Sequence, residues 1–324
     1  MIEEGRIIGV GFPYVEGKIK SSHLRLPQLS TELSVYLDLH SEADLYAGGS
    51  IPNIVTSLVR LTNNSNIRLF SCVGDDSRGK FYMQNMDQRI GAPAVSAENP
   101  TGVWVGIYQD GLIEGRDFYG AALDLDVSQD ELRSLKNNIL ITDADACIIS
   151  KTRDQVQKAI EAVEEEGLFA LSLVGVRERE DISQLLSFTN KIPDAIFGNV
   201  HELNTLTGIS DSEQAIREIS PETKIVVITQ AEKGAMIRFN NYIFDVPAYT
   251  VSEDNIIDET GAGDTFMGTM LALLLSTASR QWTEIDVRKA AGVASYASAE
   301  VIQSMHSRLT STMASDVRRY ATNF

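Results

Sequence analysis

Two periods of apolar and polar positions alternate along much of the chain. Short apolar runs of strand length are followed by segments in which apolar residues recur every three to four positions, as in amphipathic helices. Strands that alternate with helices of this length indicate a parallel sheet covered on both faces. From residue 146 onward the pattern predicts strands at 147–149, 169–174, 195–197 and 224–229, and helices at 153–166, 178–188 and 200–206.

The first half of the chain departs from this pattern. An apolar strand at 7–10 precedes a mixed segment up to residue 46, in which we expect a small β flap. Residues 101–108 alternate as a strand, turn at 110–111 and return through 116–119, which predicts a hairpin that pairs with the flap. We therefore expect one main domain over residues 1–324, with lid segments at about 13–46 and 101–120.

Other segments complete the predicted set of elements. Residues 67–73 have the composition of a buried strand, and a helix is expected through Met83, Met86 and Ile90. Pro52 suits the first turn of a helix that runs to Leu61. A hairpin is predicted at 235–239 and 242–246, followed by helices at 264–276, 283–303 and 312–321.

Composition and charge narrow the class of protein. A chain of 324 residues with 43% hydrophobic residues can bury a large core. The net charge of −17 repels nucleic acids and anionic membranes, and no uncharged apolar run approaches membrane-spanning length. Two cysteines in apolar contexts and the absence of a signal-peptide pattern at the start predict a cytoplasmic protein. From the charge and the lack of a long apolar run, we expect neither nucleic-acid nor membrane partners.

The strongest candidate for chemistry is the stretch 258–264, which reads Asp-Glu-Thr-Gly-Ala-Gly-Asp. Extended segments precede it and an apolar helix follows, so Gly261, Ala262 and Gly263 are expected at a helix start, where unpaired amides attract anions. Asp264 then falls in the first turn, where its carboxylate can accept a proton from an attacking hydroxyl. The alternative is that Asp264 merely caps the helix after a tight turn.

Two further motifs have both a functional and a structural interpretation. Asn199 and Glu202 lie three residues apart after a strand, where they can hold the waters of a magnesium ion or simply cap a helix. Gly48 and Gly49, with Asn53, offer close backbone approach and an amide suited to sugar hydroxyls, or a plain turn before a helix.

In this order, Gly48-Gly49-x-x-x-Asn53, Gly74-Asp75-x-x-x-Gly79, Asn199-x-x-Glu202 and the stretch 258–264 resemble the ribokinase or PfkB family of carbohydrate and nucleoside kinases. The resemblance implies a three-layer αβα fold with a central, mostly parallel sheet and a small β-sheet lid. It also implies transfer of the γ-phosphoryl group of ATP to an alcohol with Mg²⁺. Many members bind a monovalent cation near the anion hole, and some dimerise through the lid, so both properties stay open here.

The resemblance also implies roles for particular residues. Asp264 would be the general base, and Gly261, Ala262 and Gly263 the anion hole. Glu202 would approach Mg²⁺ through water, and Glu16 would stand where relatives place an aspartate that binds substrate hydroxyls. The implied nucleotide-site residues are Asn199, Glu202, Thr229, Gly234, Ala291 and Ser295, and the implied substrate-site residues are Glu16, Gly48, Gly49 and Asn53.

Three residues depart from the family pattern. Glu16 is one methylene longer than the usual aspartate, Gln230 follows Thr229 where glycine is common, and His306 replaces a frequent glycine. We expect altered acceptor contacts at Glu16, altered nucleotide contacts at Gln230, and a surface position without catalytic function for His306.

The substrate stays open between two classes. The segments 116–122 and 294–302 look more like the adenosine-kinase and fructokinase-like branch than like ribokinase itself. A small sugar is our first prediction and a nucleoside our second. A third alternative, from a different functional class, is a sensor that binds a nucleotide or sugar without turnover.

Overall fold

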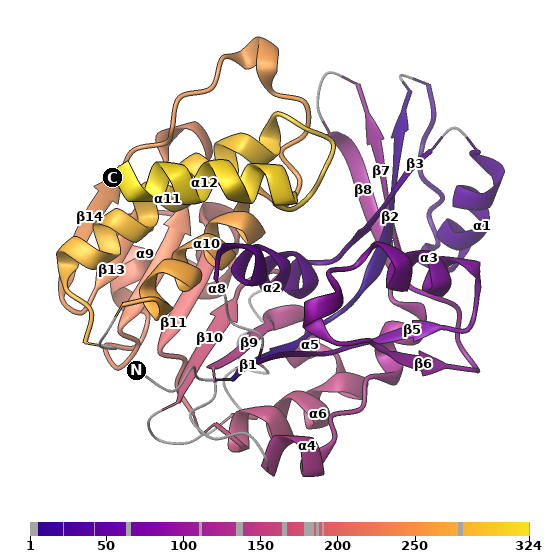
Figure 1. The fold of residues 1–324 in the computed structure, drawn as a ribbon, viewed down its shortest axis with the longest axis horizontal. Coiled ribbons are helices and arrows are strands. Elements are labelled where there is room, and N and C mark those ends of the chain that lie inside the picture. The colour runs from indigo at the N-terminus through magenta and orange to yellow at the C-terminus, as the bar shows by residue number, and fades with distance from the viewer. Residues whose placement is uncertain are drawn as a thin grey trace.

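The computed structural model describes residues 6–323 except 22, 42, 63–65, 110–111, 134–138, 164–166, 178–184, 186–187, 190 and 278–280 (Figure 1). Its centre is an eight-stranded sheet in the order β14-β13-β12-β11-β10-β9-β1-β4. The last six strands in this order are parallel, and β13 and β14 form an antiparallel hairpin at one edge. The strands are β1 (Ile7–Val10), β4 (Ile67–Phe70), β9 (Ile139–Asp143), β10 (Leu168–Ser172), β11 (Ala195–Asn199), β12 (Ile225–Thr229), β13 (Ala235–Phe239) and β14 (Tyr242–Val246).

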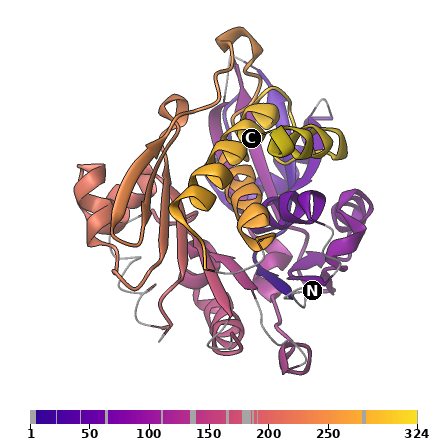
Figure 2. The same cartoon turned by 60° about the vertical axis from the view of Figure 1, so that its left-hand side comes forward.

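Helices cover both faces of this sheet. In Figure 2 the sheet lies between α10 and α11 on one side and α8 and α9 on the other. None of the helices that the structure describes combines the length and apolar character needed to traverse a lipid bilayer. The helices are α1 (Leu33–Leu39), α2 (Ser50–Leu61), α3 (Ser77–Asn85), α4 (Gln129–Arg133), α5 (Ala144–Ile148), α6 (Ser150–Glu161), α8 (Val200–Thr207), α9 (Ser212–Glu218), α10 (Ala262–Leu275), α11 (Glu284–Ile302) and α12 (Ser311–Asn323).

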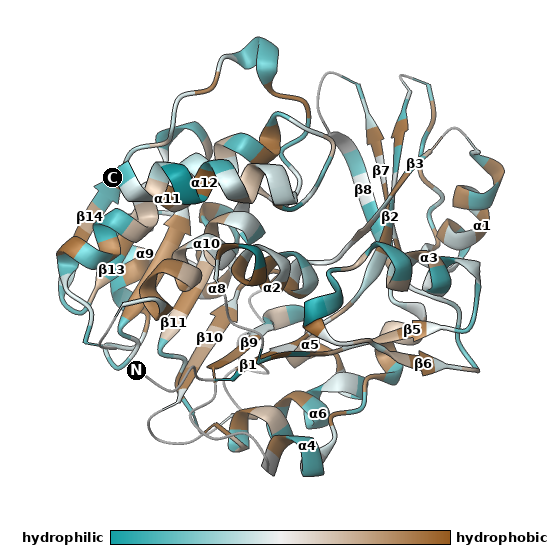
Figure 3. Ribbon diagram, in the orientation of Figure 1, coloured by the Kyte–Doolittle hydropathy of each residue, from teal (hydrophilic) through white to brown (hydrophobic). Residues whose placement is uncertain are grey.

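Alternate residues of each parallel strand face opposite helix layers. Along β12, Ile225 and Val227 belong to the core cluster that includes residues of α2, α10 and α11, whereas Val226 and Ile228 belong to the cluster that includes residues of α6, α8 and α9. Both faces are therefore apolar, which explains why the strands read as continuous apolar runs. Figure 3 shows these strands in brown between helices whose outer turns are teal.

A second sheet stands apart from the first and forms the lid (Figure 1). Its four strands have the order β3-β2-β7-β8. Helix α1 packs on it through Leu33 and Leu37, together with Ile19 and Val105 of the sheet. The strands are β2 (Tyr14–Lys20), β3 (Asp44–Gly48), β7 (Val103–Tyr108) and β8 (Leu112–Phe118), and a separate parallel pair is formed by β5 (Cys72–Gly74) and β6 (Ala94–Ser96).

The α/β fold and the lid sheet agree with the prediction, but two local assignments were wrong. Residues 147–149 are not a strand. The strand in this region is β9, which ends at Asp143, and the Asp143 side chain accepts the Ala146 amide at 2.8 Å, so that helix α5 begins at Ala144. Residues 33–39 are helical rather than part of a β flap, since Leu33 and Leu37 recur at helical spacing and are buried, whereas Val35 is 61% exposed.

Smaller differences concern element ends and gaps. The predicted strand at 67–73 is split into β4 and β5, and the helix through Met83 ends at Asn85. Most of the predicted helix at 178–188, the turn at 110–111 and the end of the helix at 153–166 lie outside the described residues. The predicted hairpin at 235–239 and 242–246 matches β13 and β14.

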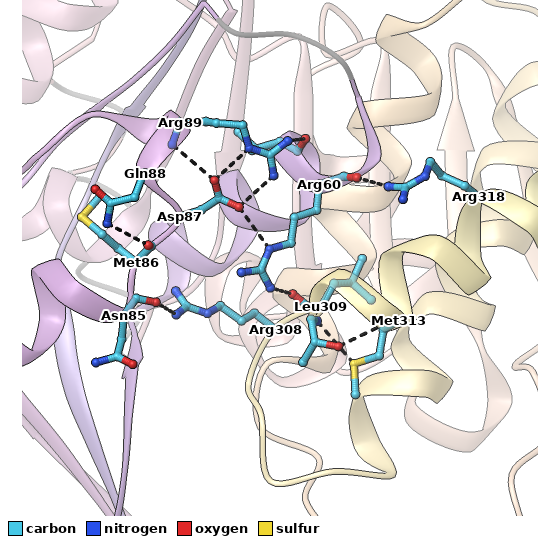
Figure 4. Close-up of polar contacts among 12 residues, drawn as sticks. Arg60, Asn85, Met86, Asp87, Gln88, Arg89, Arg308, Leu309, Met313 and Arg318 are labelled. Atoms are coloured by element: carbon cyan, nitrogen blue, oxygen red, sulfur yellow. Dashed lines mark hydrogen bonds and ion pairs between the residues drawn. The ribbon is translucent and has the colours of Figure 1, made fainter.

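The C-terminal segment is tied to the end of α2 by arginine side chains (Figure 4). Arg60 Nε donates to Asp87 at 3.2 Å, and Arg60 also donates to the carbonyl of Leu309. Arg318 donates to the carbonyl of Arg60, and Arg308 donates to the carbonyl of Asn85 at 2.9 Å. These bonds fix residues 308–318 against α2 and the end of α3, and thereby fix Ser307, which borders the site described below.

Helices α2 and α10 approach closely at Gly268. A Cβ at this position would lie 2.5 Å from the carbonyl oxygen of Ile54, which belongs to the α2 backbone. Backbone atoms cannot rotate away as a side chain can, so only glycine allows this spacing. The spacing matters because both helices begin at the site.

We expect Gly268→Ala to destabilise the protein by about 1 to 3 kcal/mol, because the added methyl group forces the two helices apart. The midpoint of thermal unfolding should fall by about 2 to 6 °C. The control is Gly263→Ala on the same helix, where a Cβ meets no atom within 4 Å. An unchanged midpoint for Gly268→Ala would show that the helices are not in tight contact there.

Candidate active site

Two cavities open at the carboxyl ends of the parallel strands and meet at the start of α10. The first has a volume of about 400 Å³ and the second about 580 Å³. Asn199 and Gly263 line both cavities. This edge of an open α/β sheet is where such folds bind ligands.

The first cavity lies between the β12–β13 turn and the helices α10 and α11. Thr229, Gly234, Ala262, Phe266 and Ser295 are among its lining residues. The Ser295 hydroxyl accepts the Tyr249 amide at 2.6 Å, so it also fixes the loop that forms one wall. Apolar side chains such as Phe266 and Ile302 line the cavity beside a few polar groups, which suits a flat heterocycle with a charged tail.

The second cavity lies between the lid and the main sheet and is lined by many polar side chains. Strand β2 and the start of α2 contribute Glu16, Ser50 and Asn53 to its wall. Asp117, Asp143, Asp145 and Arg177 line it as well, as do the aromatic residues Phe12, Tyr14 and Trp104.

The start of α10 presents main-chain donors to the point where the cavities meet. Gly261 precedes the helix with φ of +81°, and a Cβ there would lie 1.8 Å from the carbonyl oxygen of Ser307. Within the described part of the chain, the amides of Gly263 and Asp264 donate to no acceptor. Unpaired amides and the positive end of the helix dipole together favour an anion at this place.

Asp264 lies in the first turn of α10 and is oriented by the first turn of α2. Its Oδ1 accepts the Ser50 hydroxyl at 2.7 Å, and its Oδ2 accepts the Asn53 amide at 3.2 Å. Burial raises the pKa of Asp264 from 3.8 to about 7, against the lowering effect of these two donors. The carboxyl group is thus both fixed in position and poised to exchange a proton near neutral pH.

Asn199 and Glu202 form a reciprocal capping box at the start of α8. The Asn199 side chain accepts the Glu202 amide, and the Glu202 side chain accepts the Asn199 amide, each at 2.9 Å. Burial raises the pKa of Glu202. The structural interpretation of this pair therefore holds, and both residues also line the second cavity. Capping and ligand binding are compatible, since a carboxylate has further acceptor positions.

The remaining candidates from the sequence differ in whether they reach a cavity. Gly49 and Asn53 line the second cavity. Gly48 leaves room for the Glu16 carboxylate, whose oxygen would lie 1.7 Å from a Cβ there. Ala291 is fully buried in the core and does not line either cavity.

The three departures from the family pattern also have defined places. Glu16 is 3% exposed and accepts the Gly49 amide at 3.2 Å and the Ser307 hydroxyl. The Gln230 amide donates to the Gly234 carbonyl at 2.7 Å within the β12–β13 turn. His306 is exposed and packs edge-on against Tyr46, with ring centroids 5.2 Å apart.

Sequence reasoning missed several residues of the site. Ser50, which orients Asp264, was hidden in a presumed turn. Asp145 accepts the Tyr119 hydroxyl at 2.7 Å and lies 3.7 Å from Arg177, which also lies 3.4 Å from Asp117. This network follows from the fold alone, because its members come from three distant segments.

Lys18 was missed as well, because its strand has the pattern of a strand with one solvated face. It alternates with apolar residues along β2, on the same face as Glu16, and is 1% exposed. Lys20 lies on the same face and is exposed, so the alternation along β2 does not reveal that Glu16 and Lys18 are buried and paired.

An αβα fold with a β lid, two cavities that meet at a helix start, and a carboxylate at their junction define a ribokinase-like phosphotransferase with an alcohol group as acceptor. The sequence profile of the pfkB family of carbohydrate kinases matches residues 28–313, and the chain belongs to that family. The family resemblance noted from the motifs is thereby confirmed.

Individual relatives include both sugar and nucleoside kinases. The chain is 25% identical to a fructokinase of Vibrio alginolyticus over 241 residues, which cover 70% of this chain and 76% of that protein. It is 35% identical to a cytidine kinase of Thermococcus kodakarensis over 80 residues, which cover only 24% of this chain and 28% of that protein.

Solved structures with the same fold carry the same two types of name. Adenosine kinase from Sinorhizobium meliloti has a TM-score of 0.80 at 17% identity and covers 98% of this chain and 99% of its own. Fructokinase from Vibrio cholerae, solved with fructose, ADP and a potassium ion, has a TM-score of 0.76 at 18% identity, with 95% of each chain covered. A protein described as a ribokinase II from E. coli, in complex with ATP and Mg²⁺, has a TM-score of 0.75 at 18% identity and covers 99% of this chain and all of its own.

The raised pKa of Asp264 predicts a stability change in Asp264→Asn. The folded state holds this proton more tightly than the unfolded chain does. The contribution of the protonated carboxyl group to the free energy of unfolding is therefore complete below about pH 4 and is lost as the pH rises through about 7. The amide cannot ionise, so at pH 8 the variant should unfold about 1 to 3 °C above the wild type.

Thermal unfolding at pH 5 and pH 8 measures this difference, with Asp245→Asn on the exposed edge of β14 as the control. The unfolding midpoint of Asp264→Asn minus that of the wild type should be larger at pH 8 than at pH 5, and the control should show no such trend. An Asp264→Asn variant that is less stable than the wild type at both values would contradict the account of a desolvated carboxylate.

Proposed function

We propose that the protein transfers the γ-phosphoryl group of ATP to a hydroxyl group of a small sugar. The observation that carries this proposal is the position of Asp264, a carboxyl group with a pKa of about 7 at the junction of two cavities and in the first turn of α10. One cavity takes the nucleotide and the other takes the acceptor. The transferred group passes over the free amides between them.

Asp264 acts as the general base in this proposal. Its carboxylate accepts the proton of the acceptor hydroxyl as the oxygen attacks the γ-phosphorus. Ser50 and Asn53 hold the carboxylate in one orientation, which keeps its free lone pairs directed at the cavity. Gly261, Ala262 and Gly263 form the anion hole, where the unpaired amides of Gly263 and Asp264 stabilise the charge on the phosphoryl oxygens, while the Ala262 amide donates to the Glu259 carbonyl at 3.2 Å and closes the turn.

The nucleotide occupies the first cavity in this proposal. Thr229, Gly234 and Ser295 line it around the adenine and ribose, and Asn199 lies where the cavity meets the phosphate path. Mg²⁺, which would neutralise charge on the phosphates, would be approached by Glu202 through water. The buried carboxyl of Glu202 fits that use, because a nearby cation favours its ionised form.

The polar character of the second cavity favours a sugar. Asp117, Asp143 and Asp145 line it, and carboxylates are good acceptors for the several hydroxyl groups of a polyol. Arg177 lies among them and adds donors, with its amino group 3.0 Å from the Tyr119 hydroxyl. Glu16, Gly48, Gly49 and Asn53 complete the substrate side of the proposed site.

A nucleoside is the second candidate. Phe12, Tyr14 and Trp104 also line the acceptor cavity, and aromatic rings stack on bases. Two of these rings already have partners, since Phe12 and Tyr14 pack against Tyr119 with centroids 5.1 and 6.1 Å apart. Trp104 is therefore the ring most available for a base. A binder without turnover would not need the base and anion hole together, so we rank a sensor last.

The proposal also covers the setting of the reaction. We place the protein in the cytoplasm, where ATP is supplied and where Cys72 and Cys147, both free and buried, stay reduced. A homodimer through the lid remains a proposal, as does the treatment of residues 1–324 as one domain.

The acceptor is identified by measuring ADP release with a panel of pentoses, hexoses and nucleosides at saturating ATP and Mg²⁺. We expect at least one sugar to exceed every nucleoside in kcat/KM by tenfold or more, about 1.4 kcal/mol of transition-state discrimination. A nucleoside at the head of the series would replace the first candidate with the second. No turnover with any acceptor would favour the sensor.

With the best acceptor, we expect Asp264→Asn to lower kcat by about a hundredfold or more, because the amide cannot take the proton at the start of α10, beside the unpaired main-chain amides. Binding of ATP, measured by calorimetry, should stay within about tenfold of the wild type. Asp245→Asn serves as the control for a lost surface carboxylate and should keep full turnover. Near-normal kcat in Asp264→Asn would remove this residue from the mechanism.

A further inference from the structure

A buried lysine lies directly beside the loop that forms the anion hole. Lys18 of β2 is 1% exposed, and its ammonium group donates to three oxygens. These are the carboxylate of Asp258, the carbonyl of Met305 at 2.7 Å and the hydroxyl of Ser307 at 2.9 Å. An ammonium group in the interior is unfavourable unless it is paired and fully hydrogen-bonded, and here all three of its donors are used.

The other groups that face this ammonium add to its stabilisation. The Glu16 carboxylate lies 3.9 Å away, on the same face of β2. The rings of Tyr46 and Tyr108 lie beneath it, with centroids 5.2 and 6.0 Å from Nζ. One cation therefore stands between two carboxylates and two aromatic faces, in a pocket closed to water.

The three oxygens that bind Lys18 form the kind of set that binds a metal cation. A carboxylate, a main-chain carbonyl and a hydroxyl from two segments far apart in the sequence, at 258 and at 305–307, converge on one point. Hard oxygen ligands of this mixture suit alkali and alkaline-earth cations. With the ammonium in place, the same oxygens cannot also surround a potassium ion, and the charge of Lys18 would repel it.

We propose that Lys18 supplies, from within the chain, the fixed positive charge that a monovalent cation supplies in relatives, so that phosphoryl transfer here does not depend on potassium. The fructokinase from Vibrio cholerae with this fold was solved with a potassium ion. The proposal rests on the function proposed above. It answers the question of monovalent-cation binding, which the family resemblance left open.

The charge acts on the anion hole through the two segments that shape it. Asp258 Oδ1 accepts the Thr260 amide at 2.9 Å, which fixes the turn before Gly261. Ser307, held by Lys18 through its hydroxyl, presses its main chain against Gly261, where no Cβ could fit. Lys18 is thus a positioning residue, because it holds Asp258 at the start of the loop and Ser307 of the segment packed against the loop, but does not contact the reacting groups.

Lys18 also joins the lid to the anion hole. It belongs to β2 of the lid sheet, and the neighbouring strand β7 contributes Tyr108, whose hydroxyl lies 3.0 Å from the Thr260 hydroxyl. An internal lysine therefore ties the base of the lid to the loop permanently, whereas a bound ion would come and go with its concentration.

The first test measures thermal unfolding in choline chloride, sodium chloride and potassium chloride at equal ionic strength. The wild-type midpoint should differ by no more than about 1 °C among the salts, because no cation site is open. Lys18→Ala leaves the Asp258, Met305 and Ser307 oxygens around a vacant space. Potassium should raise its midpoint by about 3 °C or more over choline. Lys20→Ala, an exposed lysine on the same strand, should behave as the wild type.

The second test measures turnover in the same salts with the best acceptor. The wild type should change by less than about twofold between choline and potassium. Lys18→Ala should lose about tenfold or more of its kcat in choline and regain most of it in potassium or ammonium, with sodium and lithium less effective because of their size. A lysine with only a packing role would give a loss that no cation repairs.

Two results would overturn the proposal. One is a wild type that needs potassium for turnover or is clearly stabilised by it. The other is a folded Lys18→Ala variant that responds to no cation in either measurement. If Lys18→Ala does not fold, the wild-type salt series alone decides. If no acceptor is turned over, the unfolding series still tests the cation site, so failure of the proposed function and failure of this inference remain distinguishable.

Discussion

A partly buried carboxyl group at the positive end of a helix is the constraint around which this structure is organised. Asp264 must face a substrate hydroxyl, yet burial opposes its ionisation and raises its pKa to about 7. The helix start and the donors Ser50 and Asn53 offset part of that penalty. The close contact of α2 with α10 at Gly268 keeps donors and acceptor in register. Packing deep in the core and proton transfer at the surface of the cavity are therefore parts of one arrangement.

The charge of the whole molecule makes local positive potential necessary. A chain with a net charge of −17 repels ATP, so the anionic phosphates must be met by groups at the site itself. The structure provides the unpaired amides at the start of α10 and the positive end of that helix dipole. These groups leave the net charge of the chain unchanged, but they act at short range and in a medium where they are poorly screened.

The sequence predicted the parts of the fold that follow from periodicity. Strands buried on both faces and the C-terminal helices were found because their apolar patterns are long and regular. The strand at 139–143 was missed because two apolar runs follow each other there, and only the cap formed by Asp143 shows where strand ends and helix begins. In residues 33–39 a cluster of apolar side chains concealed the spacing of Leu33 and Leu37.

The candidate site was predictable to the extent that its residues are adjacent in sequence. The stretch 258–264 and the pair Asn199 and Glu202 could be recognised because a helix start fixes their geometry locally. Lys18, Ser50, Asp145 and Arg177 depend on contacts across more than a hundred residues or on the docking of the lid, which no local pattern reports. Ala291 shows the converse case, since resemblance pointed to a helix near the nucleotide while this side chain faces the core.

The central claim is that Asp264 and the first turn of α10 meet the acceptor oxygen and the γ-phosphate together. A crystal structure with Mg²⁺, a non-hydrolysable ATP analogue and the best acceptor tests it most directly. We predict the reacting hydroxyl within about 3 Å of an Asp264 carboxylate oxygen, in line with the γ-phosphorus, and that phosphate against the Gly263 amide. An acceptor hydroxyl bound away from Asp264, or a γ-phosphate that does not reach the start of α10, would contradict the account.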